Sequence, residues 1–149
     1  MAELDASTFD FWLGEWDCTF DGGHAVNVVT REHRGNVIVE RFAADAPQAF
    51  SGTSVSVFTG HDSSWRQTWV DDAGCYWAFE GGLVDGNPSF GTPVPVDAEQ
   101  LFKRMVFTDI GDDAFHWRWE SSPDGDVWTI NWEICLLYTS DAADERRCV

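Results

Sequence analysis

Short runs of alternating apolar and polar residues fill most of the chain and predict β-strands. Between residues 14 and 134, segments rich in β-branched and aromatic side chains are separated by Gly, Asp, Asn and Ser turns at intervals of about 8–12 residues. The nine predicted strands are residues 14–20, 24–33, 36–43, 51–60, 65–71, 75–81, 100–108, 114–121 and 126–134. Tight links of this kind join sequential antiparallel strands, so the pattern predicts an up-and-down meander. Because closure removes unpaired strand edges, we expect the meander to close into a barrel.

Three segments depart from the strand pattern. Residues 3–13 place Phe9, Trp12 and Leu13 at helical spacing, which predicts a short helical plug at one end of the barrel. Residues 82–98 contain three of the five prolines and several glycines, so we expect a long loop of the kind that often covers a binding site. Residues 98–105 have helix-forming composition, which makes the strand at 100–108 the weakest of the nine.

Alternation along the predicted strands assigns side chains to the two faces of the sheet. Trp65, Gln67, Trp69 and Asp71 share one face of their strand, and this mixture of aromatic and polar side chains is unusual for a packed core. We interpret it as the wall of a ligand-bearing interior. In the strand at 114–121, alternation places Phe115, Trp117 and Trp119 on one face. In the strand at 126–134, it places Trp128, Ile130, Trp132 and Ile134 on one face.

Length and charge narrow the class of protein. A chain of 149 residues with 44% hydrophobic residues is the size of one domain with a real core. The formal net charge is −17, and such a surface repels nucleic-acid phosphates and anionic lipids, so we predict neither a nucleic-acid nor a membrane partner. The sequence has no apolar run long enough to span a bilayer and no basic, apolar leader, so we expect a cytoplasmic protein.

The C-terminal segment, residues 135–149 (CLLYTSDAADERRCV), lacks strand alternation. The stretch 135–145 resembles an in-frame translation of a transposon-type sequencing adaptor. We therefore predict one barrel domain over residues 1–134 and a non-native tail over 135–149; an ordinary polar extension is the alternative. Without the tail, Cys18 and Cys75 remain, and their spacing indicates neither a zinc site nor a redox pair.

Three motifs together resemble a known group of proteins. The segment 9–16 (FDFWLGEW) places a Gly-x-Trp directly after the predicted helical turn, as in the first strand of lipocalins and related calycins. With residues 67–71 (QTWVD) and 120–128 (ESSPDGDVW), it is similar to an uncharacterised bacterial family of calycin-like barrels, over roughly residues 9–134. The resemblance implies a fold but no reaction or ligand. The family usually ends its last strand with Tyr-x-Arg, and this chain lacks that motif after Ile134.

The leading functional hypothesis is a non-catalytic barrel that binds a small hydrophobic or aromatic molecule, which can carry an anionic group. The chain contains nine tryptophans, and the alternative is that most of them are packed core. Arginines are scarce in this chain, and an inward-facing arginine would supply the anion contact; the alternatives are a buried or cross-strand ion pair with a carboxylate, or simple solvent exposure. The predicted ligand-binding residues are Trp65, Gln67, Trp69, Asp71, Arg104, Trp117, Arg118, Trp119 and Glu120.

Two other classes of function stay open. One is an enzyme in the same barrel, with Asp71 or Glu120 as general base held by Arg104 or Arg118. The other is a packed structural barrel that only associates with protein. His116 would be the haem ligand if haem were bound, but the four histidines have no metal-binding spacing, so we predict no cofactor, no metal and no catalytic residue. The oligomeric state is left open.

Overall fold

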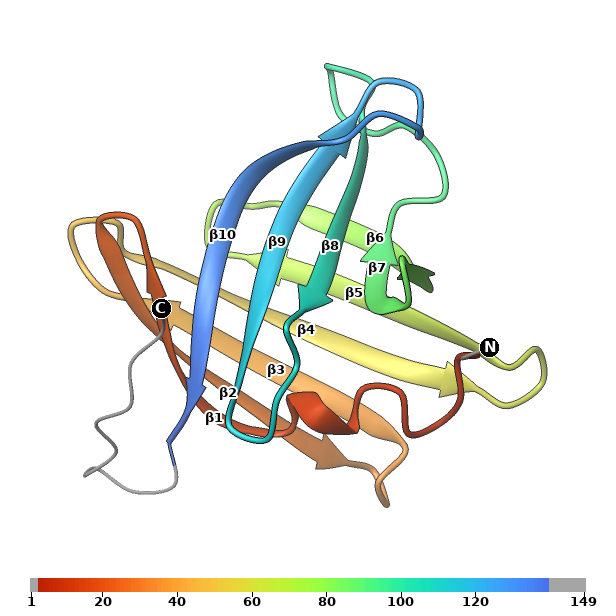
Figure 1. The fold of residues 1–149 in the computed structure, drawn as a ribbon, viewed down its shortest axis with the longest axis horizontal. Helices are drawn as coiled ribbons and strands as arrows, with labels where there is room; N and C mark the ends of the chain where they lie inside the picture. Colours follow the sequence, from red (N-terminus) through yellow and green to blue (C-terminus); the bar gives the residue numbers. More distant parts are fainter. Residues whose placement is uncertain (1–2, 140–149) are drawn as a thin grey trace.

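The protein is a closed antiparallel β-barrel in a computed structural model that describes residues 3–139 (Figure 1). Its strands are β1 (Gly14–Phe20), β2 (Gly23–Glu32), β3 (Val37–Ala44), β4 (Phe50–Thr59), β5 (Ser64–Asp71), β6 (Tyr76–Val84), β7 (Asn87–Gly91), β8 (Phe102–Thr108), β9 (Ala114–Ser122) and β10 (Thr129–Tyr138). Each strand pairs with the next along the chain, and β10 pairs with β1. The predicted all-β, up-and-down closed barrel is therefore confirmed.

The barrel has ten strands in the described residues, one more than expected, because the predicted loop at 82–98 contains the end of β6 and all of β7. Asp85 and Gly86 both have positive φ, 50° and 82°, as a tight two-residue hairpin turn requires. Pro88, one of the prolines that predicted a loop, has no N–H group to donate to a neighbouring strand. It is compatible with β7 because it precedes the three residues that pair with β8. The expectation of one long loop was wrong. The strand expected at 100–108 is present as β8.

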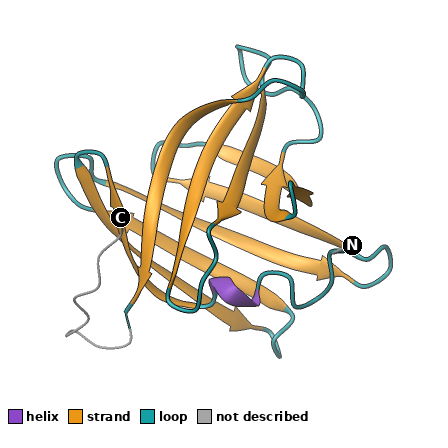
Figure 2. Cartoon of the chain, in the orientation of Figure 1, coloured by secondary structure: helices purple, strands orange, loops and turns teal. Residues whose placement is uncertain are grey.

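The predicted helical plug is only a three-residue 3-10 turn, Asp10–Trp12 (Figure 2). It precedes β1 and lies at the barrel end where β1 begins and β10 finishes. Phe9 and Trp12 are buried there, and the Phe9 ring stacks on Phe90 at 4.5 Å between ring centroids. A single turn suffices because aromatic packing, rather than helix length, fixes it in the barrel end.

The first residues of the predicted tail belong to the barrel. Strand β10 continues through Tyr138 and pairs with β1, from Cys135 opposite Thr19 to Tyr138 opposite Trp16. Leu136 is buried, with 4% of its surface exposed. The expectation that residues 135–149 carry no strand pattern was wrong for 135–138, whereas residues 140–149 lie outside the described part of the chain.

Inward and outward positions alternate along most strands, as predicted. On β5, Trp65 and Gln67 are buried while Val70 is exposed on the other face. The alternation fails on β10, where the pairing register with β9 shifts between Ile130 and Trp132. Because of this irregularity Ile130 is exposed instead of sharing the inner face with Trp132.

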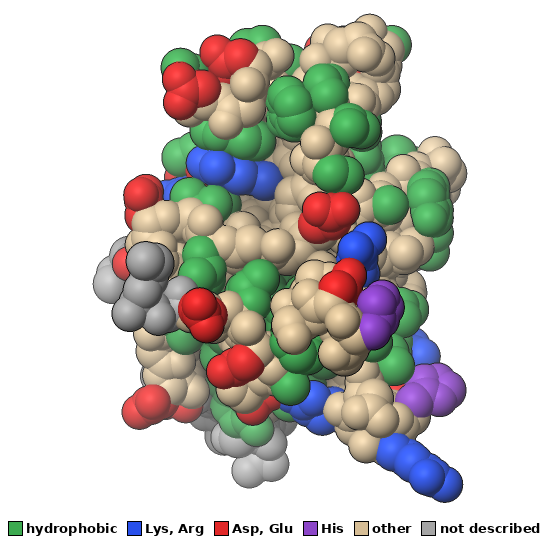
Figure 3. Space-filling view, turned by 90° about the vertical axis from the view of Figure 1, so that its right-hand side faces the viewer, with side chains coloured by type: hydrophobic (Ala, Val, Ile, Leu, Met, Phe, Trp, Pro, Cys, Tyr) green, Lys and Arg blue, Asp and Glu red, His purple; other side chains and the backbone are tan. Residues whose placement is uncertain are grey.

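The outer surface mixes charged and apolar side chains. Acidic side chains are spread over the face seen in Figure 3, with basic and hydrophobic ones between them. Within residues 3–139, no helix is long and apolar enough to cross a membrane.

Candidate ligand-binding site

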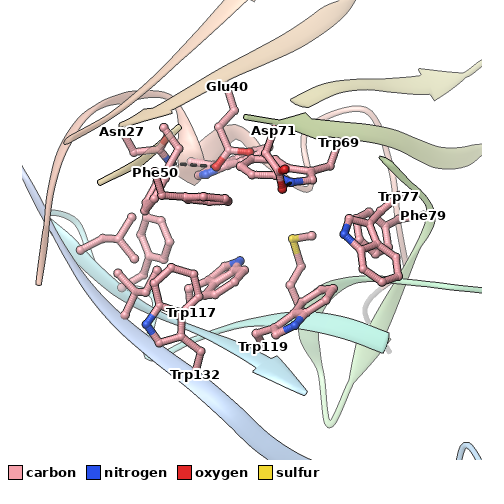
Figure 4. A pocket seen from close by; sticks show the side chains of 16 residues that line it. Asn27, Glu40, Phe50, Trp69, Asp71, Trp77, Phe79, Trp117, Trp119 and Trp132 are labelled. Carbon is pink, nitrogen blue, oxygen red and sulfur yellow. Dashed lines mark hydrogen bonds between the residues drawn. The ribbon is translucent and has the colours of Figure 1, made fainter. Parts of the chain in front are cut away.

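A cavity of about 200 Å³ lies inside the barrel (Figure 4) and reaches the N-terminal turn. Trp12 of that turn contributes to its wall. Its aromatic lining consists of Trp12, Phe42, Phe50, Trp69, Trp77, Phe79, Phe115, Trp117, Trp119 and Trp132. Six of the nine tryptophans therefore border this space, and the interior is not filled completely by side chains.

The inward positions in the middle of β4 carry small residues. Gly52, Ser54 and Ser56 occupy the positions that alternate inward, and both serines are completely buried. A Cβ atom at Gly52 would lie 2.2 Å from the indole of Trp69, so glycine is needed for this indole to lie against β4.

The opposite wall is formed by a cluster of indoles from β6, β9 and β10. Trp117 and Trp119 stack with ring planes 2° apart, at 6.2 Å between centroids. Trp77 meets Trp119 edge to face at 5.9 Å, and Trp132 meets Trp117 in the same way at 5.6 Å. These contacts hold the indoles in place around the cavity, as Figure 4 shows for the labelled tryptophans.

Glu40 of β3 places a carboxyl group in this aromatic wall. Ser54 Oγ donates to Glu40 Oε1 at 2.7 Å, and Asn27 Nδ2 donates to Glu40 Oε2 at 2.9 Å. Glu40 is only partly buried, and it borders the cavity. Burial raises the pKa of Glu40, and the hydrogen bonds from Ser54 and Asn27 oppose that rise only in part.

Asp71, at the end of β5, is the second carboxylate of the cavity wall. Its Oδ2 accepts a hydrogen bond from Trp69 Nε1 at 2.9 Å. Its Oδ1 accepts from the backbone N–H groups of Ala73 and Cys75 at 3.0 and 3.1 Å, which shapes the turn into β6. Asp71 therefore orients one cavity tryptophan and ties it to the strand end.

The sequence-predicted site residues separate into three groups in the structure. Trp69, Asp71, Trp117 and Trp119 line the cavity. Trp65 and Gln67 face inward but are not part of the cavity wall. Trp65 Nε1 donates to the Asp5 carbonyl at 2.8 Å, and Gln67 Nε2 donates to Ser56 Oγ at 2.9 Å. Trp65 therefore packs against the N-terminal segment, where its ring also meets Phe9 edge to face.

Arg104, Arg118 and Glu120 form the third group, on the face opposite the cavity. Arg104 is the neighbour of the cavity residue Met105 on β8, so its side chain points to the opposite face of the sheet. On β9, Arg118 and Glu120 are in the same way neighbours of the cavity residues Trp117 and Trp119. Arg104 Nε lies 2.7 Å from Glu120 Oε1, and Arg118 Nε lies 3.0 Å from Glu120 Oε2. The geometry thus matches the cross-strand ion pair rather than an anion contact inside the barrel.

The guanidinium of Arg104 also lies over the indole of Trp128, 3.8 Å from the ring centroid. Trp128 was expected to share the inner face of its strand with Trp132. Trp128 instead precedes β10, which begins at Thr129. The register shift between Ile130 and Trp132 separates it from the cavity residues Trp132 and Ile134. This arrangement covers Glu120 and explains how a carboxylate on the outer face is 3% exposed.

Sequence reasoning missed Glu40 and Asn27. A signal was present, because Glu40 alternates with Ile38 and Phe42 on the apolar face of its strand. Asn27 similarly alternates with the buried residues Ala25 and Val29. A charged or amide side chain at an inward position needs a partner or a ligand, and this criterion would have selected both residues.

Comparison with known protein families and with curated proteins finds no match for the chain. Within residues 3–139, no group of three or more His, Cys, Asp and Glu side chains is placed to hold a metal ion.

Proposed function

We propose that the protein is a binding barrel that holds one small, largely apolar aromatic molecule in its interior. The observation that carries this proposal is the cavity of about 200 Å³ with its wall of indole and phenyl rings. An apolar cavity of roughly 150 Å³ accepts benzene, so this space suits a molecule of one or two rings. Flat walls with a few polar groups are typical of small-molecule sites in barrels.

The placement of the arginines changes one part of the sequence-based hypothesis. An anionic ligand group was expected to meet Arg104 or Arg118, but both pair with Glu120 on the other face. The same placement removes Glu120 from the enzyme alternative, because this carboxylate does not border the cavity. The lipocalin and calycin relationship, suggested by Gly14-x-Trp16 after a short turn, is part of the proposal and is supported by the closed meander.

Equilibrium dialysis with naphthalene tests the proposal. We expect saturable binding of one molecule per chain and quenching of tryptophan fluorescence, because the ring would contact several indoles. Met105→Trp should weaken binding at least about tenfold, because it adds an indole where Met105 lines the cavity. Ile134→Phe, a smaller addition to the same wall, serves if the first variant does not fold.

Val70→Trp is the matched control, since Val70 is exposed on the outer face of β5 and the same indole there leaves the cavity intact. Absence of saturable naphthalene binding to the folded wild type, or equal weakening by Met105→Trp and Val70→Trp, would contradict the proposal. Native mass spectrometry of freshly purified protein would identify a molecule that co-purifies.

A further inference from the structure

The polar groups of the cavity wall are unbalanced in charge. Two carboxyl groups, Glu40 and Asp71, border the cavity, and no Lys, Arg or His side chain does so among the described residues. In Figure 4 both lie on the same side as Trp69, across from Trp117, Trp119 and Trp132. A ligand in the cavity would therefore meet acidic groups on one side and aromatic faces on the other.

The Lys and Arg residues of β8 and β9, two strands that contribute to this wall, make ion pairs away from the cavity. Lys103 lies next to Arg104 on β8, so its side chain is on the other face of the strand. Its Nζ lies 3.9 Å from Asp97 Oδ2, and Lys103 is not part of the cavity wall. Arg104 and Arg118 pair with Glu120 on the opposite face. Neither cavity carboxyl group has a cationic partner in the described part of the chain.

Asn27 provides an independent sign of a missing hydrogen-bond donor. Its side chain is 2% exposed and borders the cavity beside Glu40. The Nδ2 atom donates to Glu40, but Oδ1 has no hydrogen-bond partner. A buried amide oxygen without a donor is costly, so a ligand that brings an N–H group next to Asn27 and Glu40 would satisfy it.

The aromatic wall also favours positive charge. Indole faces attract cations through their ring quadrupole, and the attraction grows when the cation is removed from water. Burial raises the pKa of Glu40, and a nearby positive charge would stabilise its ionised form. The indole N–H groups could donate to an anion, but that anion would also lie beside two carboxyl groups without a compensating cation.

We propose that the cavity selects an aromatic amine in its positively charged form, with the ammonium group next to Glu40 and Asn27 and the rings between the indoles. This inference rests on the proposed function and specifies the ligand class. The ammonium would donate to Asn27 Oδ1 and to the Glu40 carboxylate, and Asp71 would add a second negative charge to the wall.

Three two-ring compounds of similar size test the selection by charge: tryptamine (cation), indole-3-propionamide (neutral) and indole-3-propionate (anion). Isothermal titration calorimetry at neutral pH and fixed ionic strength measures the dissociation constant of each. We expect tryptamine to bind at least about tenfold more tightly than the amide, and the anion to bind more weakly than either.

Glu40→Gln identifies the source of the preference. The glutamine side chain keeps an oxygen that accepts from Ser54 or Asn27 but removes the carboxylate, so the ratio of tryptamine to amide affinity should fall several-fold. Glu133→Gln is the matched control. Glu133 is exposed between the cavity residues Trp132 and Ile134 of β10, so this variant removes the same charge from the outer face. Its affinity ratio should equal that of the wild type.

The outcomes separate this inference from the proposed function. Comparable binding of all three compounds, or tightest binding of the propionate, would overturn selection of a cation and leave an aromatic binding barrel in place. An equal change of the affinity ratio in Glu40→Gln and Glu133→Gln would overturn the role of Glu40, because the preference would then follow from overall charge. Failure of all three compounds and of naphthalene to bind would overturn both proposals.

Discussion

Trp16 connects the N-terminal turn, the first strand and the last strand. Its indole N–H donates to the carbonyl of Trp12 at 2.8 Å, and its ring meets Phe115 and Tyr138 edge to face at 4.7 and 5.5 Å between centroids. Gly14 precedes it with a φ of 134°, and a Cβ there would lie 2.6 Å from the Tyr138 ring. The Gly-x-Trp motif therefore has a local steric reason in this chain.

We expect Trp16→Ala to lower the free energy of unfolding by about 3–5 kcal/mol, because it removes a 2% exposed aromatic side chain and leaves a void at the barrel end. Urea denaturation followed by far-UV circular dichroism measures the loss. Trp128→Ala, on the outer side of the barrel, should cost less. A near-neutral result for Trp16→Ala would show that the indole does not hold the barrel end together.

Glu40 is the second residue with a specific expected effect, on the pH dependence of stability. Burial raises its pKa in the folded state above the ordinary value of 4.5, so the folded state binds more protons than the unfolded state between these two values. The stabilising contribution of protonated Glu40 is therefore fully present below pH 4.5 and is lost as the pH rises through the raised pKa.

Glu40→Gln isolates this effect from the other carboxyl groups. The unfolding free energy of wild type minus that of Glu40→Gln should decrease as the pH rises from about 4 to about 8, measured by urea denaturation in one buffer series. Glu133→Gln, which removes an exposed carboxyl group, is the control for the loss of one charge. A difference between wild type and Glu40→Gln that rises with pH would contradict the direction of the pKa shift.

At the scale of elements, the seam between β1 and β10 determines whether the barrel closes. The paired positions on β10 run from Cys135 to Tyr138, all of them within the segment expected to be a tail. Tyr138 packs edge to face on Trp16, at 5.5 Å between ring centroids. This short segment pairs with β1 although its sequence does not alternate, and Leu136 is its buried side chain.

We expect deletion of residues 135–149 to destabilise the protein by at least about 3 kcal/mol, because it removes the strand pairing to β1 and the buried Leu136. Thermal and urea unfolding measure the change. Deletion of residues 140–149 alone is the comparison, and the difference between the two variants gives the contribution of residues 135–139. Equal stability of the two would mean that the seam contributes nothing.

At the scale of the whole molecule, positive and negative charges are distributed differently inside and outside the barrel. The chain has 26 acidic and 9 Lys and Arg residues. On the outer face, several arginines pair with carboxylates, among them Arg66 with Asp62 and Arg41 with Glu32. The cavity wall has only acidic groups among its charged residues in the described chain. Overall acidity therefore extends into the interior, where the low dielectric strengthens its effect on a ligand.

The sequence by itself determined most of the strands, their order and the inward face of β5. Alternation placed Trp65, Gln67, Trp69 and Asp71 on one face, because side chains of a strand point to opposite faces with a period of two. The larger apolar area of that face then favoured its burial. The same rule correctly placed Trp117 and Trp119 inside. It was less successful where local geometry changes the period, as at the Asp85-Gly86 hairpin and at the β10 irregularity between Ile130 and Trp132.

Only the tertiary structure decided which inward residues border empty space and which are packed. Gln67 and Asp71 have the same place in the alternation, yet Gln67 is hydrogen-bonded to Ser56 while Asp71 lies at the cavity. The structure also brought Asn27, Glu40 and Ser54 together from three strands and paired Arg104 and Arg118 with Glu120 outside. These contacts depend on the register between strands, and the period of a single strand contains no information about that register.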